Sequence, residues 1–131
     1  MSATSLPAAT VRRVVEGVLK GERRFAAVSV TFLGPKRMTD LNREHLGHDH
    51  PTDVISFALT GPDDTLVGDI YICGAVARKQ AKAFQVPVRE ELIRLVVHGT
   101  LHVLGYDHPE GERRVGAPMW KRQERYVRRL A

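Results

Sequence analysis

The chain has 131 residues, of which 43% are hydrophobic and 27% are charged. This length fits one domain with its own core and is too short for two full-sized globular units. The composition is that of a globular protein and excludes intrinsic disorder. We therefore expect residues 1–131 to form a single domain.

The charge balance favours a polyanionic partner. Lysine and arginine outnumber aspartate and glutamate by 20 to 15, which gives a formal net charge of +5. A basic surface suits RNA, although the same charge also serves solubility alone.

The sequence contains no segment that predicts membrane insertion or export. No apolar run approaches the roughly 20 residues that span a bilayer, and residues 1–5 open no signal segment. We expect a cytoplasmic protein that does not associate with membranes. Cys73 is the only cysteine, which excludes an internal disulfide and a thiolate-rich zinc site. Any bound metal must therefore rely on histidine or carboxylate ligands.

Apolar residues recur at helical spacing in five segments and alternate in three others. In chain order, the pattern predicts a helix over 8–20 that ends at Gly21, a strand over 26–33, a helix over 36–45, strands over 54–59 and 65–72, and helices over 74–84, 89–104 and 119–130. The turn residues from Gly61 to Asp64 predict an antiparallel hairpin of the last two strands. The irregular alternation of elements favours an α+β fold, a small mixed β-sheet packed with several helices.

Three histidines surround the end of the helix predicted over 89–104. His98 and His102 are four residues apart, so on a helix they lie about 40° apart around the axis and one turn apart along it. A continued helix would carry His108 roughly 15 Å along the axis from His98, too far to share an ion with nitrogen bonds of about 2.0–2.1 Å. Gly105 provides a permissive backbone at which the chain turns back. We expect His98, His102 and His108 to bind one metal ion at the C-terminal end of this central helix.

Three neutral imidazoles leave a tetrahedral zinc ion with an open position for water, as in catalytic sites. Such a water ionises near neutral pH and attacks a carbonyl or a phosphodiester, so a hydrolase is the leading hypothesis. We expect one zinc ion per chain, although imidazoles also accept nickel, copper or cobalt. The metal-bound water is the expected nucleophile and no catalytic base is identified. Asp107 is a candidate to orient an imidazole or the water, or it is a turn residue only.

The histidine spacing is that of the long zinc-protease motif, but Gly99 stands where that motif has its catalytic glutamate. A zinc peptidase would therefore lack its general base. Two other interpretations stay open, namely histidines that are simply buried in an apolar helix and a metal that only staples the fold. Burying several unpartnered imidazoles is costly, which favours metal binding.

The sequence resembles the YbeY family of bacterial metal-dependent endoribonucleases, which are also described as ribosomal RNA maturation factors. Three blocks carry the resemblance in the same order and spacing: Leu41-Asn42 leading into Pro51–Phe57, the strand Gly68–Cys73, and the histidine segment His98–His108. The combination is far more specific than any one block, and it covers about residues 41–108.

The resemblance implies zinc at His98, His102 and His108 and single-stranded RNA as the substrate. It implies work on ribosomal RNA, notably at the 3′ end of the small-subunit RNA, and in ribosome quality control. The small ribosomal subunit and ribosome-associated proteins are then the expected partners. The alternative is a ribosome-assembly factor that binds RNA and holds a mainly structural zinc.

Two positions depart from the family pattern. Leu46 stands where the family usually has an arginine implicated in RNA handling, and Arg43 or His48 is a possible substitute for it. Ala58 stands where the family often has a proline, which alters the rim of the cleft. His45, His48 and His50 form a second cluster that is either an ion or phosphate site or a merely polar loop, since its spacing specifies no coordination geometry.

Several further residues have both a functional and a structural interpretation. Asp53 is expected to fix the start of a strand, and Asp69 either does the same or orients a ligand histidine. The basic residues towards the two ends of the chain either form a surface that binds the phosphates of RNA or are simply solvated on two helix faces. They are Arg12, Arg13, Arg23, Arg24, Lys121, Arg122, Arg125, Arg128 and Arg129. Trp120, Tyr126 and Cys73 are expected to be packing residues.

Overall fold

The structure is a computed structural model, and it describes residues 4–106 and 118–131. In chain order, the elements of these residues are α1 (Ala8–Glu22), β1 (Ala27–Leu33), α2 (Pro35–Leu46), β2 (Val54–Thr60), β3 (Leu66–Cys73), α3 (Gly74–Phe84), α4 (Val88–Val103) and α5 (Pro118–Leu130). Every helix and strand predicted from the sequence is present, and the ends differ by one or two residues. None of the helices in this part of the chain has the length and apolarity that crossing a bilayer needs.

The three strands form one mixed sheet in the order β1-β3-β2, in which β1 runs parallel and β2 antiparallel to β3. The predicted hairpin of β2 and β3 is confirmed. Its turn is closed by two backbone bonds, from Gly61 N to Thr65 O at 2.7 Å and from Asp64 N to Gly61 O at 3.0 Å. The α+β fold with a small mixed sheet is therefore confirmed as well.

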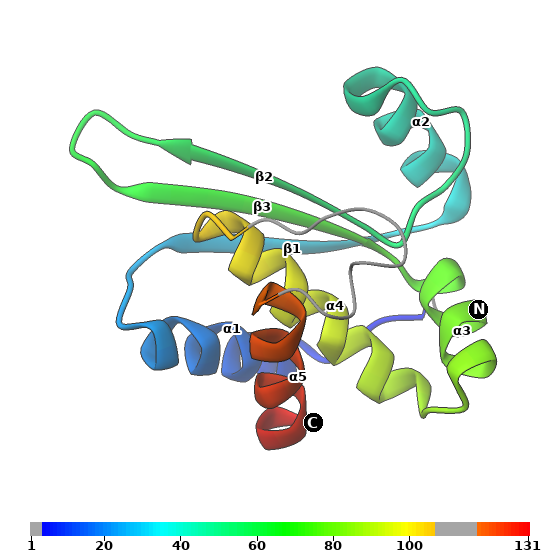
Figure 1. Cartoon of the computed structure of the whole chain (residues 1–131). Helices are drawn as coiled ribbons and strands as arrows, with labels where there is room; N and C mark the ends of the chain where they lie inside the picture. Colours follow the sequence, from blue (N-terminus) through cyan, green and yellow to red (C-terminus); the bar gives the residue numbers. More distant parts are fainter. Residues whose placement is uncertain (1–3, 107–117) are drawn as a thin grey trace.

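Helix α4 is the centre of the molecule. It crosses one face of the sheet, and α1 and α5 lie on the same side, while α2 lies beyond the opposite side (Figure 1). Gly68 and Ile70 of β3 lie against α4, because a Cβ added at Gly68 would meet Val103 and one added at Gly99 would meet Ile70. On the other face, Met38 of α2 forms a smaller core with Ile55 of β2 and Cys73, the last residue of β3. The face of the sheet that carries α4 is therefore the one on which a site at the helix end must lie.

The prediction that Gly21 ends the first helix is wrong. Helix α1 continues to Glu22 and is capped by Arg23, which takes the left-handed conformation with φ 56° and ψ 44°. Gly21 serves the packing of α5 instead, since a Cβ at this position would lie 2.3 Å from the hydroxyl oxygen of Tyr126. A glycine near a helix end signals either a stop or a close approach, and only the tertiary contact decides between them.

This contact predicts the effect of replacing Gly21 by alanine. Alanine raises helix propensity by about 1 kcal/mol, but the overpacked contact with Tyr126 costs about 1–3 kcal/mol, so we expect a net loss of stability. The matched control is Gly17→Ala in the same helix, whose Cβ would meet only the flexible end of Leu130 at 2.9 Å. Urea unfolding should show Gly21→Ala to be the less stable variant; equal or greater stability than Gly17→Ala would contradict the packing role.

Candidate functional site

His98 and His102 lie one turn apart on α4 with their rings in edge-to-face contact. The ring centroids are 4.6 Å apart and the planes make an angle of 75°. His98 is buried, with 6% of its surface exposed. The spacing therefore brings two of the three predicted ligands together. His108 and Asp107 lie outside the described residues, and the described residues contain no group of three or more histidine, cysteine or acidic side chains that could hold a metal.

The chain leaves α4 where the sequence predicts. Gly105 has a φ of 102°, a left-handed value that favours glycine. The backbone N–H groups of Gly105 and Tyr106 close the helix end by donating to His102 O and Leu101 O, each at 3.0 Å. The expected stop at Gly105 is confirmed, and the segment that continues towards His108 starts immediately after it.

Glu22 of α1 contacts residues that come before and after that segment in the chain. Its carboxylate accepts hydrogen bonds from the hydroxyls of Tyr106, at 2.6 Å, and Tyr126, and it pairs with Arg122 at 3.1 Å. Burial raises the pKa of Glu22, but the bonds from Tyr106, Tyr126 and Arg122 outweigh it, and the net pKa lies below the usual value. Burial and the bond to Glu22 raise the pKa of Tyr126 to about 12. The charged form of Glu22 thus ties the end of α4 to α5.

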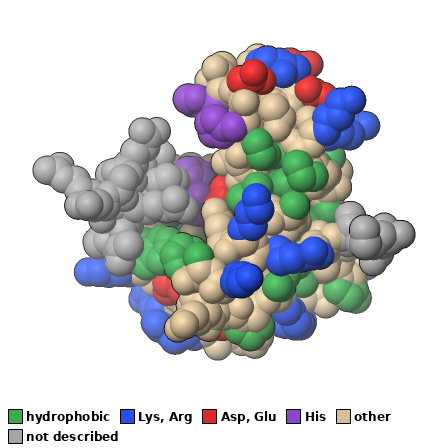
Figure 2. All heavy atoms as spheres, turned by 90° about the vertical axis from the view of Figure 1, so that its right-hand side faces the viewer, with side chains coloured by type: hydrophobic (Ala, Val, Ile, Leu, Met, Phe, Trp, Pro, Cys, Tyr) green, Lys and Arg blue, Asp and Glu red, His purple; other side chains and the backbone are tan. Residues whose placement is uncertain are grey.

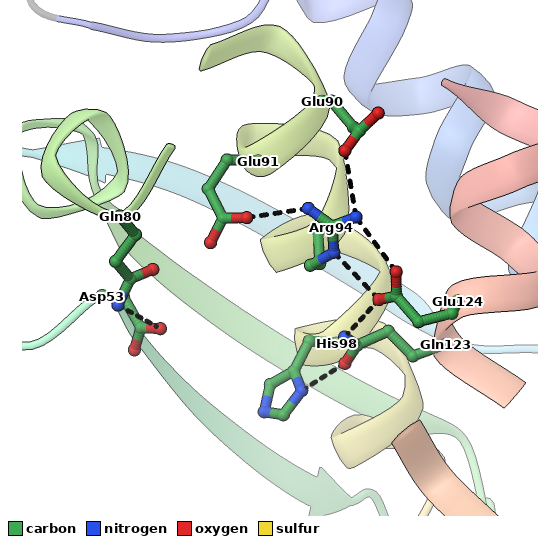
Figure 3. Close-up of polar contacts among 8 residues, drawn as sticks. All are labelled: Asp53, Gln80, Glu90, Glu91, Arg94, His98, Gln123 and Glu124. Atoms are coloured by element: carbon green, nitrogen blue, oxygen red, sulfur yellow. Dashed lines mark hydrogen bonds and ion pairs between the residues drawn. The ribbon is translucent and has the colours of Figure 1, made fainter. Parts of the chain in front are cut away.

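Gln123 of α5 determines which nitrogen of His98 carries the proton (Figure 3). The amide nitrogen of Gln123 donates to Glu124 Oε2 at 3.0 Å, so the amide oxygen is the atom that faces His98. That oxygen lies 2.6 Å from Nδ1 of His98, and an acceptor at this distance requires the proton on Nδ1. In the neutral ring Nε2 then keeps its lone pair, the state in which an imidazole binds a metal.

Arg94 fixes Glu124 in turn. Its Nε and Nη2 atoms donate to the two carboxylate oxygens of Glu124 at 2.9 and 3.0 Å, and it also pairs with Glu91 at 2.8 Å and Glu90 at 3.1 Å (Figure 3). Burial raises the pKa of Glu124, but the bonds from Arg94 and Gln123 outweigh it and the net pKa is lowered. A two-point guanidinium–carboxylate contact is rigid, so Arg94 holds the support of His98 in place.

These supporting residues were not among the candidates that the sequence pattern predicts. The spacing of Glu90 and Glu91 to Arg94 is typical of ion pairs within one helix and would have predicted that part of the network. No pattern in the sequence marks Gln123, because its role depends on how α5 packs against α4.

A cavity of about 350 Å³ adjoins His98. It lies between α3, α4 and α5, and its lining includes His98, Gln123, Glu91, Asp53 and Trp120. Burial raises the pKa of Glu91, and the hydrogen bond from Arg94 offsets this only in part.

Gly99 lies where α4 presses on the sheet. A Cβ at this position would lie 2.7 Å from Cγ2 of Ile70 and 3.0 Å from Oγ of Ser56. The site that a zinc protease uses for its glutamate therefore faces a packed sheet here, and a side chain fits there only if Ile70 and Ser56 shift. This geometry gives a physical reason for disfavouring the peptidase alternative.

The remaining acidic candidates have structural contacts. Asp53 accepts the N–H of Val54 at 2.7 Å and a bond from Gln80 at 3.2 Å, so it fixes the start of β2 as expected. Asp69 alternates with Gly68 and Ile70 along β3, which places it on the face away from α4, where it accepts a bond from Ser29 at 2.7 Å. Asp69 therefore orients neither described histidine.

The three side chains that the sequence predicts to be packing residues differ in burial. Cys73 is fully buried and Tyr126 belongs to the core. Trp120 is half-buried and lines the cavity beside His98.

The second histidine cluster belongs to the end of α2 and the following loop, where Figure 2 shows histidine side chains gathered at one end of the molecule. His45 packs edge-on against Phe57, and the rings of His48 and His50 are 5.5 Å apart. Within the part of the chain that the structure describes, these histidines belong to no metal-binding group. Leu46 is 53% exposed beside them.

Arg43, one candidate to replace the family's arginine, already forms two ion pairs. Its guanidinium contacts Asp40 at 2.8 Å and Asp49 at 2.9 Å. These bonds raise the pKa of Arg43, that to Asp49 most. A phosphate would have to compete with both carboxylates for this side chain.

The helices that carry most of the predicted basic surface are in contact. Arg13 of α1 donates to Leu130 O at the end of α5 at 2.8 Å, and Arg122 of α5 pairs with Glu22 of α1. Three arginines of α5, at positions 122, 125 and 129, line a shallow hollow of about 160 Å³. Contact between α1 and α5 is one condition for an RNA-tracking surface that extends over both helices.

Comparison with known proteins places this chain in a class of nucleases. The family model of the endoribonuclease YbeY matches residues 2–131. Proteins named endoribonuclease YbeY include one from Thermotoga petrophila, 36% identical over 89% of this chain and 76% of that protein, and one from Chlorobium luteolum, 38% identical over 90% and 85%. The chain belongs to the endoribonuclease YbeY family, as the sequence resemblance implies.

A further relative and a solved structure agree with this assignment. The endoribonuclease YbeY of Desulfitobacterium hafniense is 46% identical over 70% of this chain and 65% of that protein. The solution structure of a Thermotoga maritima protein superposes with a TM-score of 0.67 and 30% identity, covering 93% of this chain and 79% of the other. The family is one of enzymes that hydrolyse RNA phosphodiester bonds, which is the enzyme class predicted from the sequence.

The bond from His98 to Gln123 predicts the effect of Gln123→Leu on the metal-free protein. Without the acceptor, His98 should lose its preference for the form protonated at Nδ1, and long-range proton–nitrogen NMR of the imidazole should show the form protonated at Nε2. The control is Gln80→Leu, which removes an amide that bonds to Asp53 in the lining of the same cavity and should keep the native form. An unchanged His98 spectrum in Gln123→Leu would contradict the assignment.

Proposed function

We propose that this chain is a zinc-dependent endoribonuclease that cleaves single-stranded RNA during ribosomal RNA maturation, notably at the 3′ end of the small-subunit RNA, and in ribosome quality control. The observation that carries the proposal is the pair His98 and His102, whose rings are in edge-to-face contact with centroids 4.6 Å apart. Gln123 accepts from Nδ1 of His98, the arrangement that supports ligand imidazoles that bind a metal through Nε2. Membership of the endoribonuclease YbeY family supports RNA as the substrate.

In this proposal His98, His102 and His108 hold one zinc ion per chain. The two described histidines fit a metal, because a fixed tautomer and a buried acceptor are typical of ligand imidazoles. When bound there, the ion would supply the nucleophile by acidifying a water and would stabilise charge on the phosphodiester. Other divalent transition metals also suit imidazole ligands.

The chain's own residues have positioning roles. Gln123, Glu124 and Arg94 hold the ring of His98, and Asp107 is proposed to orient a ligand or the attacking water. Gly99 provides no general base, so proton transfer is assigned to no side chain. The arginines of α1 and α5 would bind phosphates of the RNA strand without reading its sequence. The expected setting is the cytoplasm, on the small ribosomal subunit and its associated proteins.

The direct test combines metal content with RNA cleavage. We expect His98→Ala and His102→Ala each to lose stoichiometric zinc and to lower cleavage of single-stranded ribosomal RNA by more than about 100-fold, since each removes a ligand. Ser29→Ala, which removes a hydroxyl bonded to Asp69 on the face of the sheet away from α4, is the control and should keep both properties. Elemental analysis and a gel-based cleavage assay measure the two quantities.

Two results would overturn the proposal. One is purified native protein without stoichiometric metal, and the other is full cleavage by His98→Ala. If a His108→Ala protein that binds RNA normally still matures ribosomal RNA in cells, the alternative of an RNA-binding assembly factor with a structural zinc is correct.

A further inference from the structure

The cavity beside His98 has the size and walls of a site for a flat aromatic ligand. Its volume of about 350 Å³ lies within the range of small-molecule sites, roughly 300–1,000 Å³. Phe84 at the end of α3 is 65% exposed, and Trp120 of α5 contributes a second aromatic side chain. Val86 and Leu95 add aliphatic surface. Exposed and half-exposed aromatic rings are the usual platforms on which unpaired bases stack.

The donors around this cavity are already used. Arg94 donates to Glu90, Glu91 and Glu124. The side-chain amide of Gln80 donates to Asp53 at 3.2 Å, and that of Gln123 donates to Glu124. A ligand that needs donors from these side chains would have to break existing bonds.

Glu91, in contrast, offers an open acceptor. Its Oε1 accepts the bond from Arg94 at 2.8 Å, while Oε2 has no hydrogen bond from any described residue. Figure 3 shows this second oxygen on the side of Gln80 and Asp53. Glu91 is only 3% exposed, and its burial raises its pKa. N–H groups of a ligand would therefore relieve the desolvation of this carboxylate.

The charges of the lining select which part of an RNA strand can enter. Among the described residues that line the cavity, the carboxylates of Asp53, Glu91 and Glu124 outnumber the guanidinium of Arg94. A negatively charged cavity repels phosphate and accepts a neutral group with N–H donors. His98 also lines the cavity, so a base bound there belongs to a nucleotide next to the phosphate at the histidines.

We propose that this cavity is a nucleobase pocket with a preference for guanine. The inference rests on the proposed endoribonuclease function. Guanine presents two neighbouring donors, N1–H and N2–H, to the carboxylate of Glu91, whose Oε2 is open and whose Oε1 has a second lone pair beside the bond from Arg94. Uracil presents one N–H between two carbonyl oxygens that the carboxylates repel. Adenine and cytosine, with one amino group each, rank between them. Glu91 is the residue that reads the base, and Phe84 and Trp120 stack on it.

Binding of nucleoside monophosphates to the metal-free protein tests the pocket without the nuclease reaction. Trp120 is the only tryptophan of the chain, so its fluorescence reports occupation of this cavity. We expect GMP to bind at least about 10-fold more tightly than UMP, which is the discrimination of a good two-point contact to a base. AMP and CMP should be intermediate.

The variant Glu91→Gln exchanges the open acceptor for a donor, because Arg94 keeps the amide oxygen on its own side. GMP affinity should fall by about 10-fold and the advantage over UMP should disappear. The matched control is Glu90→Gln, which also removes a carboxylate bound to Arg94, at 3.1 Å, but does not line the cavity. Glu90→Gln should retain the native order of affinities.

Cleavage of uridine-rich single strands that contain one guanosine completes the test, with faster cleavage beside the guanosine expected. Equal affinity for the four nucleotides, no fluorescence change with any of them at millimolar concentration, or identical behaviour of Glu90→Gln and Glu91→Gln would overturn the pocket. Cleavage without base preference would also overturn it and leave the endoribonuclease function standing. GMP binding as expected without any RNA cleavage would instead refute the proposed function.

Discussion

The structure of the site depends on one hydrogen bond, from Nδ1 of His98 to the side-chain oxygen of Gln123. It joins α4 to α5, and it is the last contact of a chain of bonds that starts at Arg94 and passes through Glu124. A carboxylate held at two points by a guanidinium cannot rotate freely, so the amide of Gln123 keeps its oxygen towards the histidine. The proton position on His98, and therefore its capacity to bind a metal, follows from an ion pair one helical turn away.

The same hydrogen-bond network lies between two different environments of His98. On one side, the pair with His102 lies at the C-terminal end of α4, from which Gly105 turns the chain. Towards α3, Glu91 and its neighbours line an acceptor-rich cavity. In the proposed function, the phosphate would bind at the metal, which attracts anions. The base would bind in the adjacent cavity, whose carboxylates repel anions. Glu22 adds stability by tying Tyr106 and α5 to α1.

Much of this arrangement could be predicted from the sequence, because it depends on local periodicity. The hairpin follows from its turn residues, and the neighbouring positions of His98 and His102 follow from helical spacing. Tertiary contacts were beyond such reasoning: Gly21 has the pattern of a helix stop but serves the approach of Tyr126. Gln123 lies in a basic amphipathic helix, where nothing local distinguishes a residue that supports a ligand from one that packs. Asp69 was a candidate partner of a histidine, and only the sheet alternation places it on the wrong face.

We propose that three imidazoles, with Nε2 of His98 among the ligand atoms, bind one metal ion and leave one coordination position open. X-ray absorption spectroscopy of the zinc-loaded protein measures this directly. We expect three histidine nitrogens at about 2.0–2.1 Å and one additional oxygen ligand in the native protein. In His98→Ala we expect one imidazole fewer. A coordination shell with fewer than three imidazoles in the native protein, or a spectrum unchanged by His98→Ala, would contradict it.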